Sequence, residues 1–90
     1  MSKMKIAAEP YHSYLSSKVV ATNNLGIWTI EYSNRGHGRA YANRTGKHSS
    51  FTYYGNGKFG FERPEALPKS VISAIHKDVI SLKRQGVLEE

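Results

Sequence analysis

The stretch PKSVISAIHKDVISLKRQG, residues 68–86, decides the fold class of this chain. Its apolar side chains recur at helical spacing and so share one face of a helix: Val71, Ile72, Ile75, Val79 and Leu82. Two basic residues lie in the last turn, where positive charge favours the helix dipole, and Gly86 suits the position that follows a helix. The sequence therefore predicts one amphipathic helix over about residues 68–85.

The residues before this helix have the alternation of β-strands. Within residues 25–32, Trp28, Ile30 and Tyr32 alternate with a second set of side chains, and we expect this first set to face the core. Three further strands are predicted, over residues 39–44, 49–54 and 59–62. Ala40 is small enough to lie beneath the helix.

Turns separate these strands. Asn56-Gly57 is the strongest hairpin signal, because a type I′ turn requires positive φ at both central residues. Residues 33–38 contain two glycines that are free to take positive φ, and they are predicted as another turn. Earlier in the chain, residues 18–21 are predicted as a strand that ends in a turn at residues 22–24, Thr-Asn-Asn.

The order of elements is strands first and one long helix last. It predicts an α+β domain, a small antiparallel meander of three to five strands packed under a C-terminal helix. Residues 1–90 form one small domain, with the sheet at about residues 17–62. The helix covers one face of the sheet, and the other face stays open to solvent or to a partner.

Composition restricts the classes of function. The formal net charge is +6, which favours anionic partners. The chain has no cysteine, so disulfides and thiolate metal sites are excluded and a cytoplasmic setting is expected. No apolar run approaches the length of a membrane span, and the N-terminus lacks the apolar region of a signal peptide, so no membrane partner is predicted.

One window is free of acidic residues. Between Tyr32 and Phe61 there is no Asp or Glu, yet the window holds five Lys or Arg residues and seven of the ten aromatic residues. Guanidinium groups beside aromatic rings suit a polyanion with stackable bases. The window therefore favours a non-enzymatic protein that binds nucleic acid through a basic and aromatic sheet face.

The candidate contact residues come from this window. Within the loop of residues 35–39, two arginines flank exposed backbone N–H groups that can wrap a phosphate. Tyr53, with Phe51 or Phe59, is a candidate to share the open face with Arg39 and Tyr41. Because Tyr53 and Tyr54 point to opposite faces, one of these two tyrosines is expected to be exposed, and the sequence leaves open which one. The full set of candidates is Arg35, His37, Arg39, Tyr41, Arg44, Lys47, Tyr53, Tyr54 and Lys58.

A short segment partly resembles a known RNA-binding motif. Lys58, Phe59, Gly60 and Phe61 are similar to the basic-aromatic-glycine-aromatic strand of RNA-recognition and cold-shock domains. The glycine that should follow the lysine precedes it here, and Glu62 stands where an apolar residue belongs. The order of the elements also differs, so the chain is not assigned to either family.

No catalytic site, metal site or cofactor is predicted. The four histidines are too scattered for a metal-binding spacing. None of the seven acidic residues lies in a recognisable pair with a base or a nucleophile. The chain is therefore expected not to be an enzyme.

Two alternatives stay open. The same arginine and tyrosine side chains suit a protein interface. The chain is then an accessory protein, of the kind that phages use, which docks on an acidic surface of a larger host protein and inhibits or redirects it. In addition, an exposed edge strand allows a homodimer to form through the sheet; residues 6–8 are one predicted edge strand.

Overall fold

The computed structural model describes residues 3–6, 11–12 and 17–88. Five consecutive strands form an antiparallel meander: β3 (Ser17–Leu25), β4 (Trp28–Ser33), β5 (Gly38–Ala42), β6 (His48–Gly55) and β7 (Lys58–Phe61). A 3-10 turn, η2 (Pro64–Ala66), leads into the helix α1 (Lys69–Arg84). The predicted α+β meander with one C-terminal helix is confirmed.

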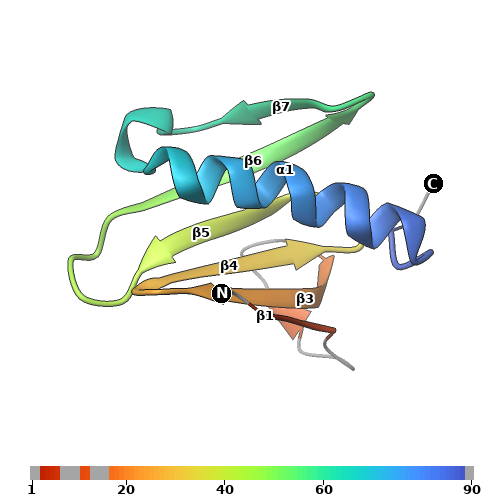
Figure 1. Cartoon of the computed structure of the whole chain (residues 1–90), viewed down its shortest axis with the longest axis horizontal. Coiled ribbons are helices and arrows are strands. Elements are labelled where there is room, and N and C mark those ends of the chain that lie inside the picture. Colours follow the sequence, from red (N-terminus) through yellow and green to blue (C-terminus); the bar gives the residue numbers. More distant parts are fainter. Residues whose placement is uncertain (1–2, 7–10, 13–16, 89–90) are drawn as a thin grey trace.

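Two short strands extend the sheet beyond β3. They are β1 (Lys3–Ile6) and β2 (Tyr11–His12), and both pair antiparallel with β3. The edge strand predicted at residues 6–8 therefore begins earlier, and its residues 7 and 8 lie outside the described part of the chain. This places β1 and β2 at one edge of the sheet and β7 at the other (Figure 1).

The helix α1 lies across one face of the sheet, and the core is the space between them (Figure 1). Trp28, Ile30 and Tyr32 all point to this side, as the alternation predicted. Ala40 is paired with Ile30 on the neighbouring strand, and its small side chain leaves room for the helix. On α1 the fully buried side chains are Val71, Ile75, Val79 and Leu82.

The β6–β7 hairpin has the predicted turn. Asn56 has φ 54° and Gly57 has φ 76°, so both central residues adopt the left-handed conformation that a type I′ turn requires. This turn sets the register in which Tyr53 faces Phe59 and Phe51 faces Phe61. Those four rings therefore lie on one side of the sheet, the side that α1 covers.

The turn predicted at residues 22–24 is wrong. These residues belong to β3, and the chain turns instead at Gly26 (φ 65°) and Ile27. Asn23 is buried, and its Nδ2 donates to the Asp78 carboxylate on α1 at 2.6 Å. Local interactions alone would favour a turn at an asparagine. Here the contact with Asp78 on another element keeps Asn23 in the strand.

The ends of α1 differ slightly from the prediction. The helix begins at Lys69, and Pro68 caps it in an extended conformation; the Pro68 carbonyl accepts from the N–H of Val71 and Ile72. Gly86 follows the helix with φ 74°, as expected for a residue that ends a helix. Within the described residues, no helix is long and apolar enough to cross a membrane.

Candidate functional site

The face of the sheet opposite α1, called here the open face, is polar. Alternate residues of a strand point to opposite sides, so the strand registers identify its members. From β3 to β6 they are Val19, Thr22, Asn24, Thr29, Glu31, Ser33, Arg39, Tyr41, His48, Ser50 and Thr52. Val19, opposite Ser33, is the one aliphatic side chain among them, and it is buried together with Thr29, Glu31 and Ser33. The exposed part of this face lies on β5 and β6, where its side chains carry hydrogen-bonding groups.

Arg39 and Tyr41 lie at the centre of the open face, on β5. The Arg39 guanidinium carbon lies 5.0 Å from the centroid of the Tyr41 ring, the geometry of a cation–π contact. Both side chains are half-buried, and Ser50 and His48 are their neighbours on β6. The ring thus holds the guanidinium near the sheet and limits the number of its rotamers. The prediction that Arg39 and Tyr41 occupy the open face is confirmed.

Tyr54 adds an exposed aromatic ring beside β7. A β-bulge between Tyr53 and Gly55 interrupts the ladder here, and 70% of the Tyr54 surface is exposed. Its ring lies against Gly60, where an added Cβ would be 2.9 Å from the Tyr54 Cε2 and hydroxyl oxygen atoms. Because Gly60 has no side chain, the ring can lie flat over β7 on the open face.

The structure separates the predicted basic residues into two groups. Arg44 and Lys47 lie in the β5–β6 loop, at one end of the sheet. Arg35, in the β4–β5 loop, and Lys58, after the β6–β7 turn, lie at the opposite end. With Arg39 between the two groups, the cations are spread along the sheet and do not form one compact cluster.

Of the two tyrosines that the sequence left open, Tyr54 lies on the open face, whereas Tyr53, Phe51 and Phe59 do not. Tyr53 lies on the helix side, and its ring centroid is 4.9 Å from that of Phe59. Phe51 is buried in the core on the same side. The physical reason is that strands with few aliphatic residues must use their aromatic rings to fill the core, so Tyr54 remains as the exposed ring of β6.

His37 has a contact within the fold. Its Nδ1 lies 3.4 Å from the backbone nitrogen of Tyr53 and accepts the hydrogen bond, which fastens the β4–β5 loop to β6. His48 is exposed at the first position of β6, at the opposite end of the sheet from His37. In the part of the chain that the structure describes, no three histidine, cysteine or carboxylate side chains gather to hold a metal ion.

Two carboxylates reach the open face from outside the acid-free window. Glu31 stands opposite Arg39 in the β4–β5 register and is 7% exposed. Glu62 follows β7, where its Oε1 accepts from the Ser50 hydroxyl at 3.3 Å. An acid-free stretch of sequence therefore does not give an acid-free surface, because neighbouring strands bring in residues from beyond its ends.

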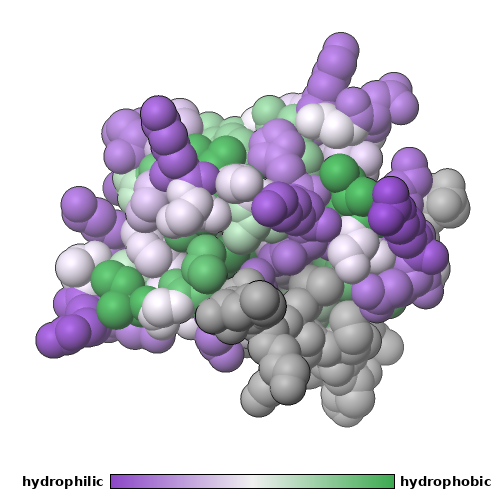
Figure 2. Space-filling model, in the orientation of Figure 1, coloured by the Kyte–Doolittle hydropathy of each residue, from purple (hydrophilic) through white to green (hydrophobic). Residues whose placement is uncertain are grey.

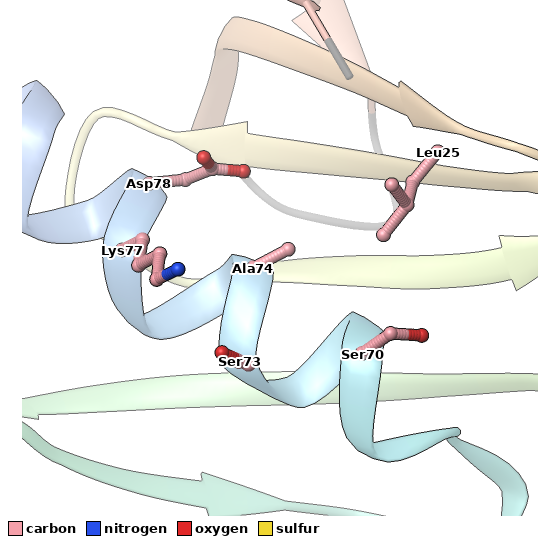
Figure 3. A pocket seen from close by; sticks show the side chains of 6 residues that line it. All are labelled: Leu25, Ser70, Ser73, Ala74, Lys77 and Asp78. Carbon is pink, nitrogen blue, oxygen red and sulfur yellow. The ribbon is translucent and has the colours of Figure 1, made fainter. Parts of the chain in front are cut away.

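A hollow on the helix side lies between β3 and α1 (Figure 3). Its volume is about 320 Å³, and it is lined by Leu25, Ser70, Ser73, Ala74, Lys77 and Asp78. The Asp78 carboxylate points toward the strands, where it accepts from the Tyr32 hydroxyl at 2.5 Å and from Asn23 at 2.6 Å. This carboxylate therefore joins the helix to the sheet. Sequence reasoning missed the contact because 46 and 55 residues separate the partners.

The side that bears α1 is mostly hydrophilic, with apolar side chains in small separate areas (Figure 2). The two sides of the domain thus differ in structure: one is a packed helix with lysines exposed to solvent, and the other is a mostly polar sheet face that is exposed along β5 and β6 and buried along β4. No protein-family model matches the chain, and no curated protein or solved structure matches it significantly. The open face is therefore interpreted from its own geometry.

Proposed function

We propose that this protein binds nucleic acid through the open face of its sheet and catalyses no reaction. The observation that supports this most directly is the Arg39–Tyr41 pair, a guanidinium 5.0 Å from an aromatic centroid on the central strand β5, on the face opposite α1. The absence of cysteine supports a cytoplasmic setting for this function.

The open face provides the two kinds of contact that nucleic-acid binding requires. Cations hold phosphates, and Arg44 and Lys47 at one end with Arg35 and Lys58 at the other can follow a sugar–phosphate backbone along the sheet. Bases are recognised by stacking and by hydrogen bonds, for which the face offers the Tyr41 ring and planar guanidinium donors. The hydroxyl groups of β6 add further hydrogen-bonding partners for either component.

Charge determines how this binding depends on salt. Each phosphate that a cation neutralises releases counterions, so affinity for a duplex should fall with a slope of about −0.9 per neutralised phosphate in a plot of log K against log salt. If Arg39 and the four cations at the two ends of the sheet each neutralise one phosphate, the slope is about −4 to −5. Fluorescence anisotropy of labelled duplex and single-stranded oligonucleotides at several salt concentrations measures this slope.

Matched variants test which face binds. Arg39→Ala removes a cation from the open face and exposes Tyr41, and we expect it to weaken binding about tenfold, as removal of a charged and stacking side chain does. Lys77→Ala removes the same charge from the helix side and should change the affinity less than twofold, roughly the effect of a distant surface charge. Equal effects in the two variants, or no binding at low salt, would contradict the proposal.

A double variant of two loop residues tests the phosphate contacts without an effect on folding. Arg44 and Lys47 are exposed in a loop, so Arg44→Ala with Lys47→Ala leaves the core intact. This double variant should reduce the magnitude of the salt slope by roughly 2, because two fewer cations neutralise phosphates. Circular dichroism confirms that each variant keeps its fold.

The exposed ring of Tyr54 favours one alternative, an acidic protein surface as the partner. Tyrosine and arginine dominate the binding energy of many protein interfaces, and 70% of Tyr54 is exposed. A pull-down from nuclease-treated lysate separates the two proposals. A stoichiometric protein that remains bound after nuclease treatment favours the accessory-protein function, and its loss favours nucleic acid.

A further inference from the structure

The strand β7 has an unused hydrogen-bonding edge. It lies at the outer edge of the sheet, and no further strand among the described residues pairs with it (Figure 1). The Glu62 N–H donates to the Ser50 carbonyl, so the residues in phase with Glu62 direct their backbone groups toward β6. Phe59 and Phe61 are in the opposite phase and direct their N–H and C=O groups outward, away from the sheet.

The sequence along this edge is complementary to itself. Residues 58–62 read Lys-Phe-Gly-Phe-Glu, and two copies can pair antiparallel about Gly60. Lys58 then faces Glu62 of the second copy, and the same pair forms again across the two-fold axis. Phe59 faces Phe61 of the second copy, and these two exchange backbone hydrogen bonds because both have outward N–H and C=O groups.

The side chains on both sides of β7 suit this arrangement. Lys58 and Glu62 are exposed and lie on the open face, in phase with Gly60. Phe59 and Phe61 lie on the helix side, half-buried against His76, whose ring centroid is 4.4 Å from that of Phe59. Gly60 falls on the axis, at a position where antiparallel strands bring their Cα atoms to about 4.5 Å. Its missing side chain allows this approach.

The same geometry fixes where the two helices lie in the dimer. A two-fold axis that continues an antiparallel sheet is perpendicular to it, so both helices lie on the same side of the joined sheet. His76 lies on the side of α1 that faces β7, where its ring packs against Phe59 and Phe61.

We propose that the protein forms a homodimer in which the two β7 strands pair antiparallel about Gly60, with an ion pair between Lys58 and Glu62 at both symmetric positions. The two open faces then form one continuous surface with two Arg39–Tyr41 pairs. The dimer requires no nucleic acid, so its test is independent of the proposed function. In the dimer Lys58 faces Glu62 and no longer contacts phosphate, so four cations per monomer remain for nucleic acid and the expected salt slope becomes about −3.6 per monomer.

Charge reversal tests the register. Sedimentation velocity over a range of protein concentrations measures the dimer dissociation constant of the full chain. Lys58→Glu places two carboxylates opposite each other at both positions, and Glu62→Lys places two ammonium groups there. Each should raise the dissociation constant about tenfold or more, since two attractive cross-strand pairs become repulsive. The double variant K58E with E62K restores both pairs and should dimerise like the wild type.

Mixing the two single variants gives the most specific result. In a heterodimer of K58E with E62K, both cross-strand pairs join opposite charges again, so the mixture should associate more tightly than either variant alone. Lys77→Glu and Glu65→Lys make the same charge changes away from β7 and should leave the dissociation constant unchanged. A wild type that stays monomeric at its highest soluble concentration overturns the proposal. Single variants that behave like these controls, or a mixture without rescue, also overturn it.

Discussion

At the scale of the residue, Gly38 controls how closely two central strands approach. An ideal Cβ at this position would overlap the carbonyl oxygen of Glu31 and lie 2.7 Å from Cζ of Phe51. The sequence predicted that both glycines of the β4–β5 turn are free to take positive φ, and Gly36 does so with φ 81°. Gly38 does not have positive φ. It is required because β4 and the Phe51 ring fill the space that a side chain would need.

Replacing Gly38 by Ala should therefore cost more than the same change at a glycine with free space around it. We expect Gly38→Ala to lower the free energy of unfolding by about 3 kcal/mol, the upper range for overpacking in a core. Gly26→Ala meets no atom within 4 Å, so it should cost only about 1 kcal/mol for its positive φ. Urea denaturation measures both, and equal losses of stability would contradict the steric explanation.

At the scale of the element, a polar contact fixes how α1 lies on β4. Tyr32 is fully buried, and its hydroxyl donates to the Asp78 carboxylate, which also accepts from Asn23. Burial, and then the charge of Asp78 and its hydrogen bond, raise the pKa of Tyr32 above its ordinary value. The apolar stripe of α1 determines that the helix binds a sheet, and this contact selects one orientation among those that bury the stripe.

This contact predicts a loss of stability in alkali. An unfolded tyrosine loses its proton near pH 10, whereas the folded Tyr32 keeps it, so the folded state binds more protons above that pH. The contribution of Tyr32 is therefore complete below about pH 10 and is lost as the pH rises further.

Tyr32→Phe tests that prediction. The variant should lose about 1–3 kcal/mol at pH 7, because Asp78 loses a buried donor, and its stability should fall less between pH 9 and about pH 11 than that of the wild type. Urea denaturation at the two pH values measures the difference. Tyr54→Phe, at a largely exposed ring, is the control and should fall as the wild type does; identical slopes for all three proteins would exclude the role of Tyr32.

At the scale of the whole molecule, the two faces of one sheet have separate functions in our proposals. The helix side supplies stability through the core, and the β5–β6 part of the open face presents half-buried and exposed polar side chains for binding. Pairing through β7 would extend both sides at once, giving a longer polar surface above a pair of adjacent helices. Salt should weaken nucleic-acid binding much more than dimerisation. Several cations of each monomer contact phosphates, whereas the dimer contains only two ion pairs, Lys58 with Glu62 at each of two symmetric positions.

The sequence predicted the helix and strands more accurately than it predicted which side chains lie on each face of the sheet. The stripe along α1, the alternation in β4 and the Asn56-Gly57 turn each depend on local periodicity, and each was correctly predicted. The turn at residues 22–24 was wrong because the partners of Asn23 and Asn24 lie on other elements. Of the candidate contact residues, Arg39, Tyr41 and Tyr54 lie on the open face, whereas Tyr53 fills the core.

The sequence by itself determined the α+β order, the basic charge and the placement of Arg39 and Tyr41 opposite the alanines of β5. These follow from period and composition, which are properties of neighbouring residues. Only the tertiary structure decided which tyrosine is exposed, that Asp78 joins α1 to β4, and that Glu31 and Glu62 share the face with the cations. The physical reason is that such contacts form between residues far apart in the chain, and their partners are chosen by the competition of all side chains for one small core.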